Sequence, residues 1–140
     1  MSLHPNDYTP SDTLVALMIA ISASDEKIGT SELVTIERII NHLPAFADFD
    51  MSRLKDISNG VLDLFADEDG LDILWDVVRA TLPERLFETA YAMACDVAVA
   101  DGRVLESELQ LLEEMRHQLN IDRLAAAAIE RGARARHLSA

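Results

Sequence analysis

Residues 100–109 read "ADGRVLESEL", a pattern that matches the second half of an EF-hand calcium loop. An acidic residue is followed by glycine and an aliphatic residue, and a glutamate stands seven positions after the aspartate, as at positions 5 to 12 of that loop. The first half of the loop needs acidic side chains at positions 1 and 3, where this chain has Val97 and Val99. The stretch is therefore only half of a calcium loop.

The same acidic pattern occurs earlier, at residues 24–33, which read "SDEKIGTSEL". Superposing the two stretches aligns Asp25 with Asp101 and Glu32 with Glu108. Each stretch follows an apolar segment rich in Ala, Met, Ile and Val, and a helix without a polar face is usually a central one. The chain is therefore predicted to contain two copies of a helix–acidic loop–helix unit, related by a pseudo-twofold axis, with their first helices packed together at the centre.

The rest of the chain also has the periodicity of helices, and the signals of strands are absent. Glycines and prolines fall mostly between the apolar segments, where they separate helices. The sequence therefore predicts an all-α, compact bundle of about seven helices. Their expected spans are about residues 10–24, 30–43, 51–64, 71–82, 83–99, 106–119 and 121–136.

The spacing of apolar residues also predicts which side chains the helices bury. The expected apolar face of the second helix consists of Leu33, Ile36, Ile40 and Leu43. The last helix is expected to bury Ile121, Leu124, Ala125 and Ala128. The buried centre, where the first and fifth helices meet, is expected to include Leu17, Ile21, Met93 and Val97.

The composition limits the class of protein and of partner. With 140 residues, 49% hydrophobic and 26% charged, the chain has the size and balance of one globular domain. We expect an N-terminal extension over residues 1–9 and a single domain over residues 10–140. The net charge of −13 repels phosphate backbones, so nucleic acid is not an expected partner. The same charge attracts cations or a basic protein. A negatively charged surface that only keeps the protein in solution explains the net charge equally well.

The cysteine content and the hydropathy of the chain indicate in which cellular compartment the protein is expected. The single cysteine, Cys95, cannot form an internal disulfide and offers no pair of thiolate ligands to a metal. No signal peptide is recognisable at the start, and the longest apolar run, residues 14–21, is too short to cross a bilayer. We therefore expect a cytoplasmic protein that does not insert directly into a membrane.

The duplication suggests why half a calcium loop is present twice. One copy supplies two carboxylates, too few for a calcium ion, which takes about six to eight oxygen ligands. Two copies supply four, so a shared cation site is predicted from Asp25, Glu32, Asp101 and Glu108. Backbone carbonyls and water would complete the shell. Because all of these ligands are oxygens, Ca²⁺, Mg²⁺ or Mn²⁺ is expected rather than zinc.

A second interpretation of the acidic residues needs no metal. An aspartate at a helix end and a glutamate in a first helical turn are also capping residues, and they interact favourably with the helix dipole. The repeat can persist because the fold needs the same turn twice. Both interpretations remain open from the sequence.

The two acidic stretches, each after an Ala-rich apolar helix in an all-helical chain, resemble the TerB family of tellurite-resistance proteins. The resemblance covers about residues 10–135, and the second stretch is the closer match, since Glu26 replaces the glycine in the first. It implies a compact bundle of about seven helices, acidic residues that chelate a metal, and a role in bacterial resistance and stress systems. The positions that match the acidic pattern are Asp25, Glu32, Asp101 and Glu108.

These observations favour a TerB-like, non-enzymatic module that binds a divalent metal and interacts with other proteins in tellurite resistance or a general stress response. No nucleophile–base pair accompanies the acidic loops, so an enzyme is not expected. Two alternatives remain: a small metal-dependent hydrolase that uses the acidic cluster to activate water, and an acidic adaptor that binds a partner without metal.

Overall fold

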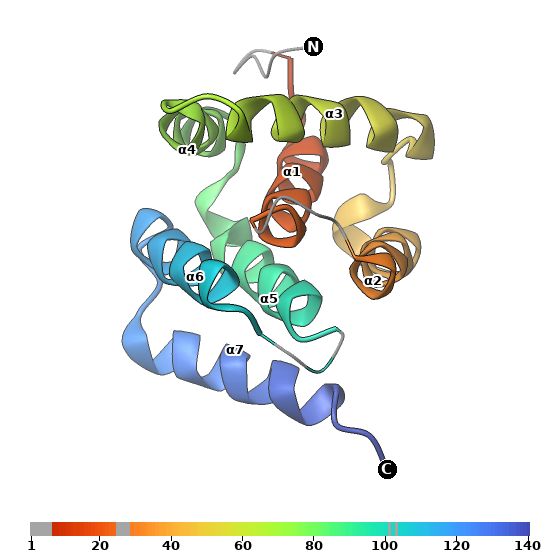
Figure 1. Cartoon of the computed structure of the whole chain (residues 1–140), viewed down its shortest axis with the longest axis vertical. Helices are drawn as coiled ribbons and strands as arrows, with labels where there is room; N and C mark the ends of the chain where they lie inside the picture. Colours follow the sequence, from red (N-terminus) through yellow and green to blue (C-terminus); the bar gives the residue numbers. More distant parts are fainter. Residues whose placement is uncertain (1–6, 25–28, 101, 103) are drawn as a thin grey trace.

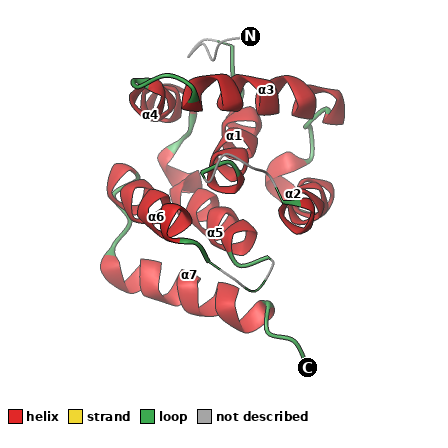
Figure 2. Cartoon of the chain, viewed as in Figure 1, coloured by secondary structure: helices red, strands yellow, loops and turns green. Residues whose placement is uncertain are grey.

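The computed structural model describes residues 7–24, 29–100, 102 and 104–140, which form helices and no strand (Figures 1 and 2). The α-helices are α1 Pro10–Ser22, α2 Thr30–His42, α3 Leu54–Phe65, α4 Gly70–Thr81, α5 Phe87–Ala98, α6 Glu106–Gln118 and α7 Arg123–Arg136. Three short 3-10 helices are η1 Pro44–Phe46, η2 Met51–Arg53 and η3 Glu84–Leu86. The predicted all-α bundle with about seven helices is confirmed. None of the helices in these ranges has the length and apolar character needed to span a bilayer.

Helices α1 and α5 occupy the middle of the bundle, and the other helices surround them (Figure 1). α3 and α4 cover one end of the molecule, near the N-terminus, and α7 lies at the other end, near the C-terminus. α1 packs against α2, α3 and α5, while α5 packs against α6 and α7 as well. The predicted contact between the first and fifth helices is therefore present, whereas the pseudo-twofold relation of the two copies stays a prediction.

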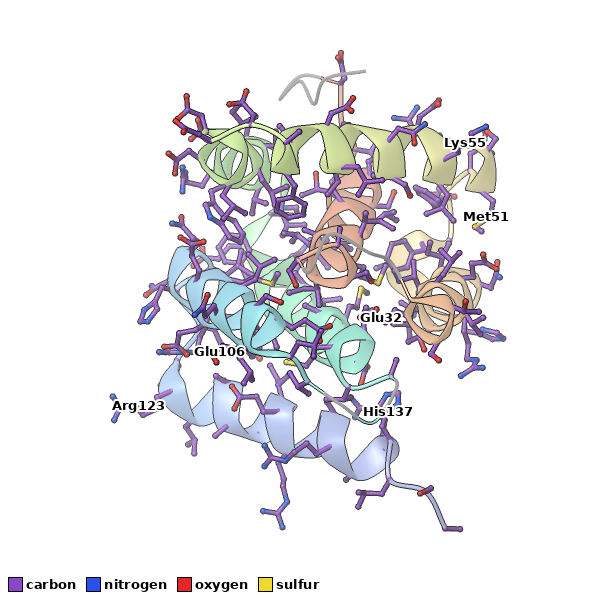
Figure 3. The ribbon with its side chains drawn as sticks, in the orientation of Figure 1. Glu32, Met51, Lys55, Glu106, Arg123 and His137 are labelled. Atoms are coloured by element: carbon purple, nitrogen blue, oxygen red, sulfur yellow. The ribbon has the colours of Figure 1, made fainter. Side chains whose placement is uncertain are left out.

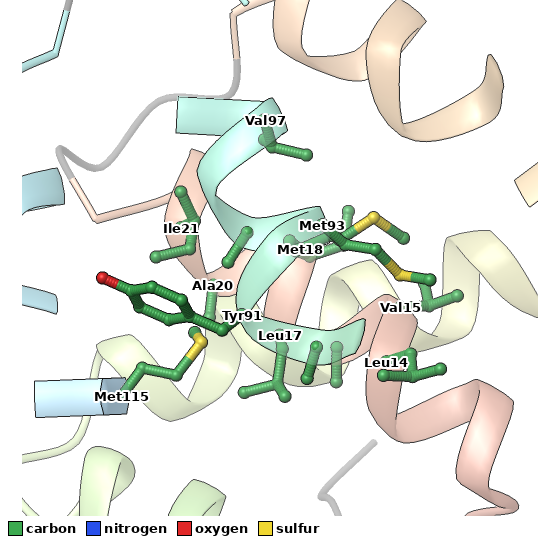
Figure 4. Close-up of a cluster of buried hydrophobic side chains, with 14 of the residues drawn as sticks. Leu14, Val15, Leu17, Met18, Ala20, Ile21, Tyr91, Met93, Val97 and Met115 are labelled. Carbon is green, nitrogen blue, oxygen red and sulfur yellow. The ribbon is translucent and has the colours of Figure 1, made fainter. Parts of the chain in front are cut away.

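The centre of the bundle is α1, whose residues from Asp12 to Ser22 are all buried. Its sequence has no charged residue after Asp12, so it has no side that favours water. The predicted core residues are confirmed, with exposed fractions of 0% for Leu17 and Ile21, 2% for Met93 and 0% for Val97. Figure 4 shows these side chains within the cluster of buried hydrophobic residues around the two central helices.

The start of α1 is held by an ion pair between a buried aspartate and a half-exposed arginine. Asp12, with 1% exposure, accepts hydrogen bonds from Arg53 Nε on Oδ1 (3.0 Å) and from Arg53 Nη2 on Oδ2 (2.7 Å). Thr9 and Asp12 also form a capping box, in which each side chain accepts from the other's backbone N–H. A buried carboxylate requires such partners, so the pair joins the start of α1 to the turn before α3.

Two predicted helix starts differ from the structure. Pro83 does not begin the fifth helix, because its extended backbone (ψ 148°) leads into the 3-10 turn η3, and α5 begins at Phe87. The last helix begins at Arg123, where Asp122 Oδ2 accepts a hydrogen bond from Ala125 N (3.3 Å). Asn120 has a left-handed φ of 51°, which breaks the helical path before α7.

Two predicted helix faces were partly wrong. Leu124 is 78% exposed, and α7 instead buries Ala126 and Ala133, with Ile129 half-buried between them. Leu33 in α2 (37%) and Leu43 directly after it (39%) are exposed, and the buried positions of α2 are Glu32, Thr35, Ile36, Ile39 and Ile40. Alanines occur on every side of α7, so the positions of its large apolar residues do not determine which face packs against α5. The face that packs is the one with the small residues Ala126 and Ala133.

We predict that Leu17→Ala lowers the free energy of unfolding by about 2–5 kcal/mol, because it leaves a cavity at a fully buried position. The matched control is Leu124→Ala, which removes the same atoms from an exposed position and should change stability by less than about 0.5 kcal/mol. Urea denaturation of both variants measures the two values. Equal effects would show that α1 is not the centre of the core.

Candidate metal centre

Two of the predicted ligands, Glu32 and Glu108, have the same position in the first turns of α2 and α6 (Figure 3 labels Glu32 and, at the start of α6, Glu106). Glu32 Oε1 accepts a hydrogen bond from Gly29 N (3.1 Å), and Glu108 Oε1 accepts one from Leu105 N (3.0 Å). Each glutamate thereby satisfies a backbone donor at the start of its helix. The capping role considered from the sequence is present in both helices.

Both glutamates are also buried, which capping alone does not require. Their exposed fractions are 7% for Glu32 and 3% for Glu108. Glutamate is almost never buried unless it is paired, and a capping glutamate can form its hydrogen bond from the surface. The capping hydrogen bond therefore does not by itself explain why these side chains are buried.

The second carboxylate oxygen of Glu108 is the most unusual atom of the centre. Oε2 is buried and has no hydrogen-bond partner among the described residues. Removing a charged oxygen from water without a compensating contact is costly, so such groups are normally paired or bound to a metal. The position of this oxygen favours a cation or a donor beside it.

The chain leaves α5 through a tight turn that leads to α6. Ala100 N donates to Val97 O (3.2 Å), and Gly102 N donates to Val99 O (3.0 Å). Gly102 has a φ of 79°, a conformation that glycine adopts without strain. This glycine of the acidic pattern is therefore required by the turn, while its counterpart Glu26 lies outside the described residues.

Each acidic stretch has a described residue that lines the same surface hollow. Its volume is about 440 Å³, and its lining includes Ser24, directly before Asp25, and Ser107, directly before Glu108. The hollow thus joins the end of α1 to the start of α6, helices that also contact each other. This proximity agrees with the requirement that both acidic stretches lie on one side of the bundle.

The other two predicted ligands, Asp25 and Asp101, lie outside the described residues. Within the described ranges, no group of three or more His, Cys, Asp or Glu side chains can hold a metal ion. Because two of the four expected ligands lie outside the described ranges, the four-carboxylate site stays a prediction. The structure adds the burial of Glu32 and Glu108, which the sequence did not indicate, because a first-turn glutamate is ordinarily exposed.

Comparison with known protein families gives a match over most of the chain. The family described as tellurite resistance protein TerB matches residues 11–131, a span that includes both acidic stretches and reaches from α1 into α7. A search of curated proteins and a search of solved structures found no match.

We predict that Glu108→Ala lowers the free energy of unfolding by about 1–2 kcal/mol, because the cap on the start of α6 is lost. Glu108→Gln keeps an oxygen for the cap and removes the buried charge, so without metal it should be at least as stable as the wild type. Chemical denaturation in the presence of chelator measures both.

The control for these variants is Glu106→Ala, which removes an exposed glutamate from the same first turn. It should change stability by no more than about 0.5 kcal/mol. If Glu108→Gln destabilised the protein as much as Glu108→Ala, the negative charge of Glu108 would itself stabilise the metal-free protein. The buried Oε2 would then have a stabilising contact that does not involve a cation.

Proposed function

The chain belongs to the family of the tellurite resistance protein TerB, and from this premise we propose that it is a non-enzymatic module that binds a divalent cation. In this proposal the cation-bound form interacts with another protein in bacterial tellurite resistance or a general stress response. The observation that carries the proposal is the buried Oε2 of Glu108, which has no hydrogen-bond partner among the residues that the structure describes.

One carboxylate can perform both roles that the acidic pattern suggests. Oε1 of Glu108 accepts the hydrogen bond from Leu105 N, and Oε2 remains available to a cation. Capping fixes the side chain in place, so the second oxygen is held in position before the cation binds. Capping therefore supports metal binding and does not exclude it.

The proposed ligand set consists of oxygens from both acidic stretches: Asp25, Glu32, Asp101 and Glu108. The hollow between Ser24 and Ser107 supports this sharing, because it places the residues that precede Asp25 and Glu108 along one surface. Oxygen ligands favour Ca²⁺, Mg²⁺ or Mn²⁺. Backbone carbonyls and water would complete the coordination.

Electrostatics also favours a cation. The chain has a net charge of −13, and four carboxylates brought together on it would repel one another. A divalent cation would remove that repulsion. Because the folded chain alone assembles the site, binding would stabilise the fold by mass action.

Two other functions are less well supported. A hydrolase would need a base beside the metal, and the described residues that line the hollow at the acidic stretches include neither histidine nor lysine, with Glu114 as a carboxylate among them. A metal-free acidic adaptor is consistent with the caps on Oε1, but it gives no partner to Oε2 of Glu108. The response of the protein to metal separates the adaptor from the cation-binding module.

We predict that Ca²⁺ or Mn²⁺ raises the Tm and that chelator reverses the rise. At a metal concentration about 100 times the Kd the stabilisation would be about 2.7 kcal/mol, which corresponds to a rise of about 5–10 °C for a domain of this size. The double variant Asp25→Asn with Asp101→Asn should lose the response. In chelator it should melt no lower than the wild type, because like-charge repulsion is reduced.

The matched control is Asp67→Asn with Asp69→Asn, which changes the net charge equally at two exposed carboxylates in the turn between α3 and α4. This control should keep the full metal response. No metal effect on the wild type, or the same effect in both double variants, would contradict a site made from the acidic stretches.

We also predict that the protein has no hydrolytic activity, since no nucleophile–base pair accompanies the acidic stretches. Phosphate esters, carboxylate esters and peptides, tested with and without Mg²⁺ or Mn²⁺, should give rates equal to the background. A turnover that Asp101→Asn abolishes would show instead that the acidic stretches support catalysis.

A further inference from the structure

A second concave site lies between α5, α6 and α7. This cavity has a volume of about 180 Å³, and neither Glu32 nor Glu108 lines it. Its apolar wall includes Val99, Val104, Leu112 and Ala133. An apolar cavity of about 150 Å³ is large enough for benzene, so this cavity has room for a branched aliphatic side chain.

A carboxylate on α7 is held at the edge of this cavity. Tyr91 Oη donates a hydrogen bond to Glu130 Oε2 (2.7 Å), and both residues line the cavity. Figure 4 shows the Tyr91 ring beside Met115, with its hydroxyl directed away from the central aliphatic side chains. Glu130 Oε1 forms no hydrogen bond within the described part of the chain and is therefore open to a donor.

The tyrosine and the cysteine of the cavity are neutral groups at physiological pH. Burial raises the pKa of the Tyr91 hydroxyl above its ordinary value, and it raises the pKa of the Cys95 thiol to about 12. Tyr91 therefore keeps its proton and remains a donor to Glu130. Cys95 stays a thiol, so it contributes to the apolar wall and does not act as a nucleophile or thiolate ligand.

A guanidinium lines the same cavity one helical turn further along α7. The Arg134 guanidinium forms no ion pair or hydrogen bond with any described residue. The nearby Glu113 carboxylate is held by Arg116 Nη2 (2.8 Å) and His117 Nε2 (3.1 Å). The edge of the cavity thus presents an acceptor at Glu130 and a donor at Arg134, four positions apart, with Cβ atoms about 5–6 Å apart on a helix.

We propose that this cavity binds a free α-amino acid with an aliphatic side chain. The ammonium group would bind Glu130, the carboxylate would bind Arg134, and the side chain would lie in the apolar cavity. The two charged groups of an α-amino acid are separated by one carbon atom, which suits neighbouring partners on one helix face. The zwitterion has no net charge, so the net charge of −13 on the protein does not repel it.

Ligands with one charge fit the cavity less well. An aliphatic carboxylate would bring a negative charge next to Glu130, and an aliphatic amine would bring a positive charge next to Arg134. Each would leave one charged group of the site without a partner, which lowers affinity. The comparison of these three ligands therefore tests the proposal directly.

The test is calorimetric titration of the full chain, in the presence of chelator, with L-leucine, 3-methylbutylamine and 4-methylpentanoate. Leucine should bind saturably, and each analogue should bind about tenfold more weakly or worse, as expected for the loss of one charged hydrogen bond. Because metal is absent, the result does not depend on the proposed cation site. Failure of one proposal therefore leaves the other intact.

Variants of the two charged residues assign the contacts. Glu130→Gln keeps an acceptor for Tyr91 but removes the charge, so leucine should bind about tenfold more weakly while 4-methylpentanoate should not lose affinity. Arg134→Gln should weaken leucine similarly, while 3-methylbutylamine should not lose affinity. The matched control is Arg131→Gln, on the same helix but not part of the cavity lining, and it should bind leucine like the wild type.

Melting curves establish that each variant is folded before titration. The proposal would be overturned if the wild type did not bind leucine saturably, or if the three ligands bound equally well. It would also be overturned if Glu130→Gln and Arg134→Gln bound leucine as the Arg131→Gln control does.

Discussion

The rest of the structure depends on the burial of α1. This helix has no polar face after Asp12, so it is stable only when other helices exclude water from all of its sides. α2, α3 and α5 pack directly against it, and α4 and α6 also contact it. Ala16 and Ala20 are fully buried within it and leave room for its neighbours. Because a charged residue cannot be buried unpaired, the ion pair of Asp12 with Arg53 marks the point where this buried helix begins.

The acidic pattern illustrates how one residue position can serve two purposes. A glutamate in the first turn of a helix is well placed to accept the orphan N–H of the preceding residue, and its second oxygen is then held in a fixed direction. In α6 that direction is toward the interior, so the cap positions a carboxylate oxygen that has no hydrogen-bond partner within the described ranges. A helix cap and a metal ligand are thus compatible roles of a single side chain, and an acidic repeat does not by itself distinguish them.

Most helix positions and the central core could be predicted from the sequence, because they follow from local features. Prolines, glycines and capping residues separate the helices, and long apolar runs identify α1 and α5 as central. The orientation of α7 could not be predicted, since its alanines occur on every side and large residues such as Leu124 face solvent. The burial of Glu108 and the hydrogen bond between Tyr91 and Glu130 depend on tertiary packing between distant segments, which no local pattern shows.

The one-sided packing of α7 has a consequence for the dynamics of the chain. This helix lies at one end of the bundle, and its main contacts are with α5 (Figure 1). Polar links at Tyr91–Glu130 and Asp96–Arg136 hold it there, and its buried face is made largely of small side chains. Such an element can detach without unfolding the core, so its amide protons should exchange through local opening at a lower free energy than those of α1. Detachment would expose the Cys95 thiol and the Tyr91 phenol, because both side chains line the cavity between α5, α6 and α7.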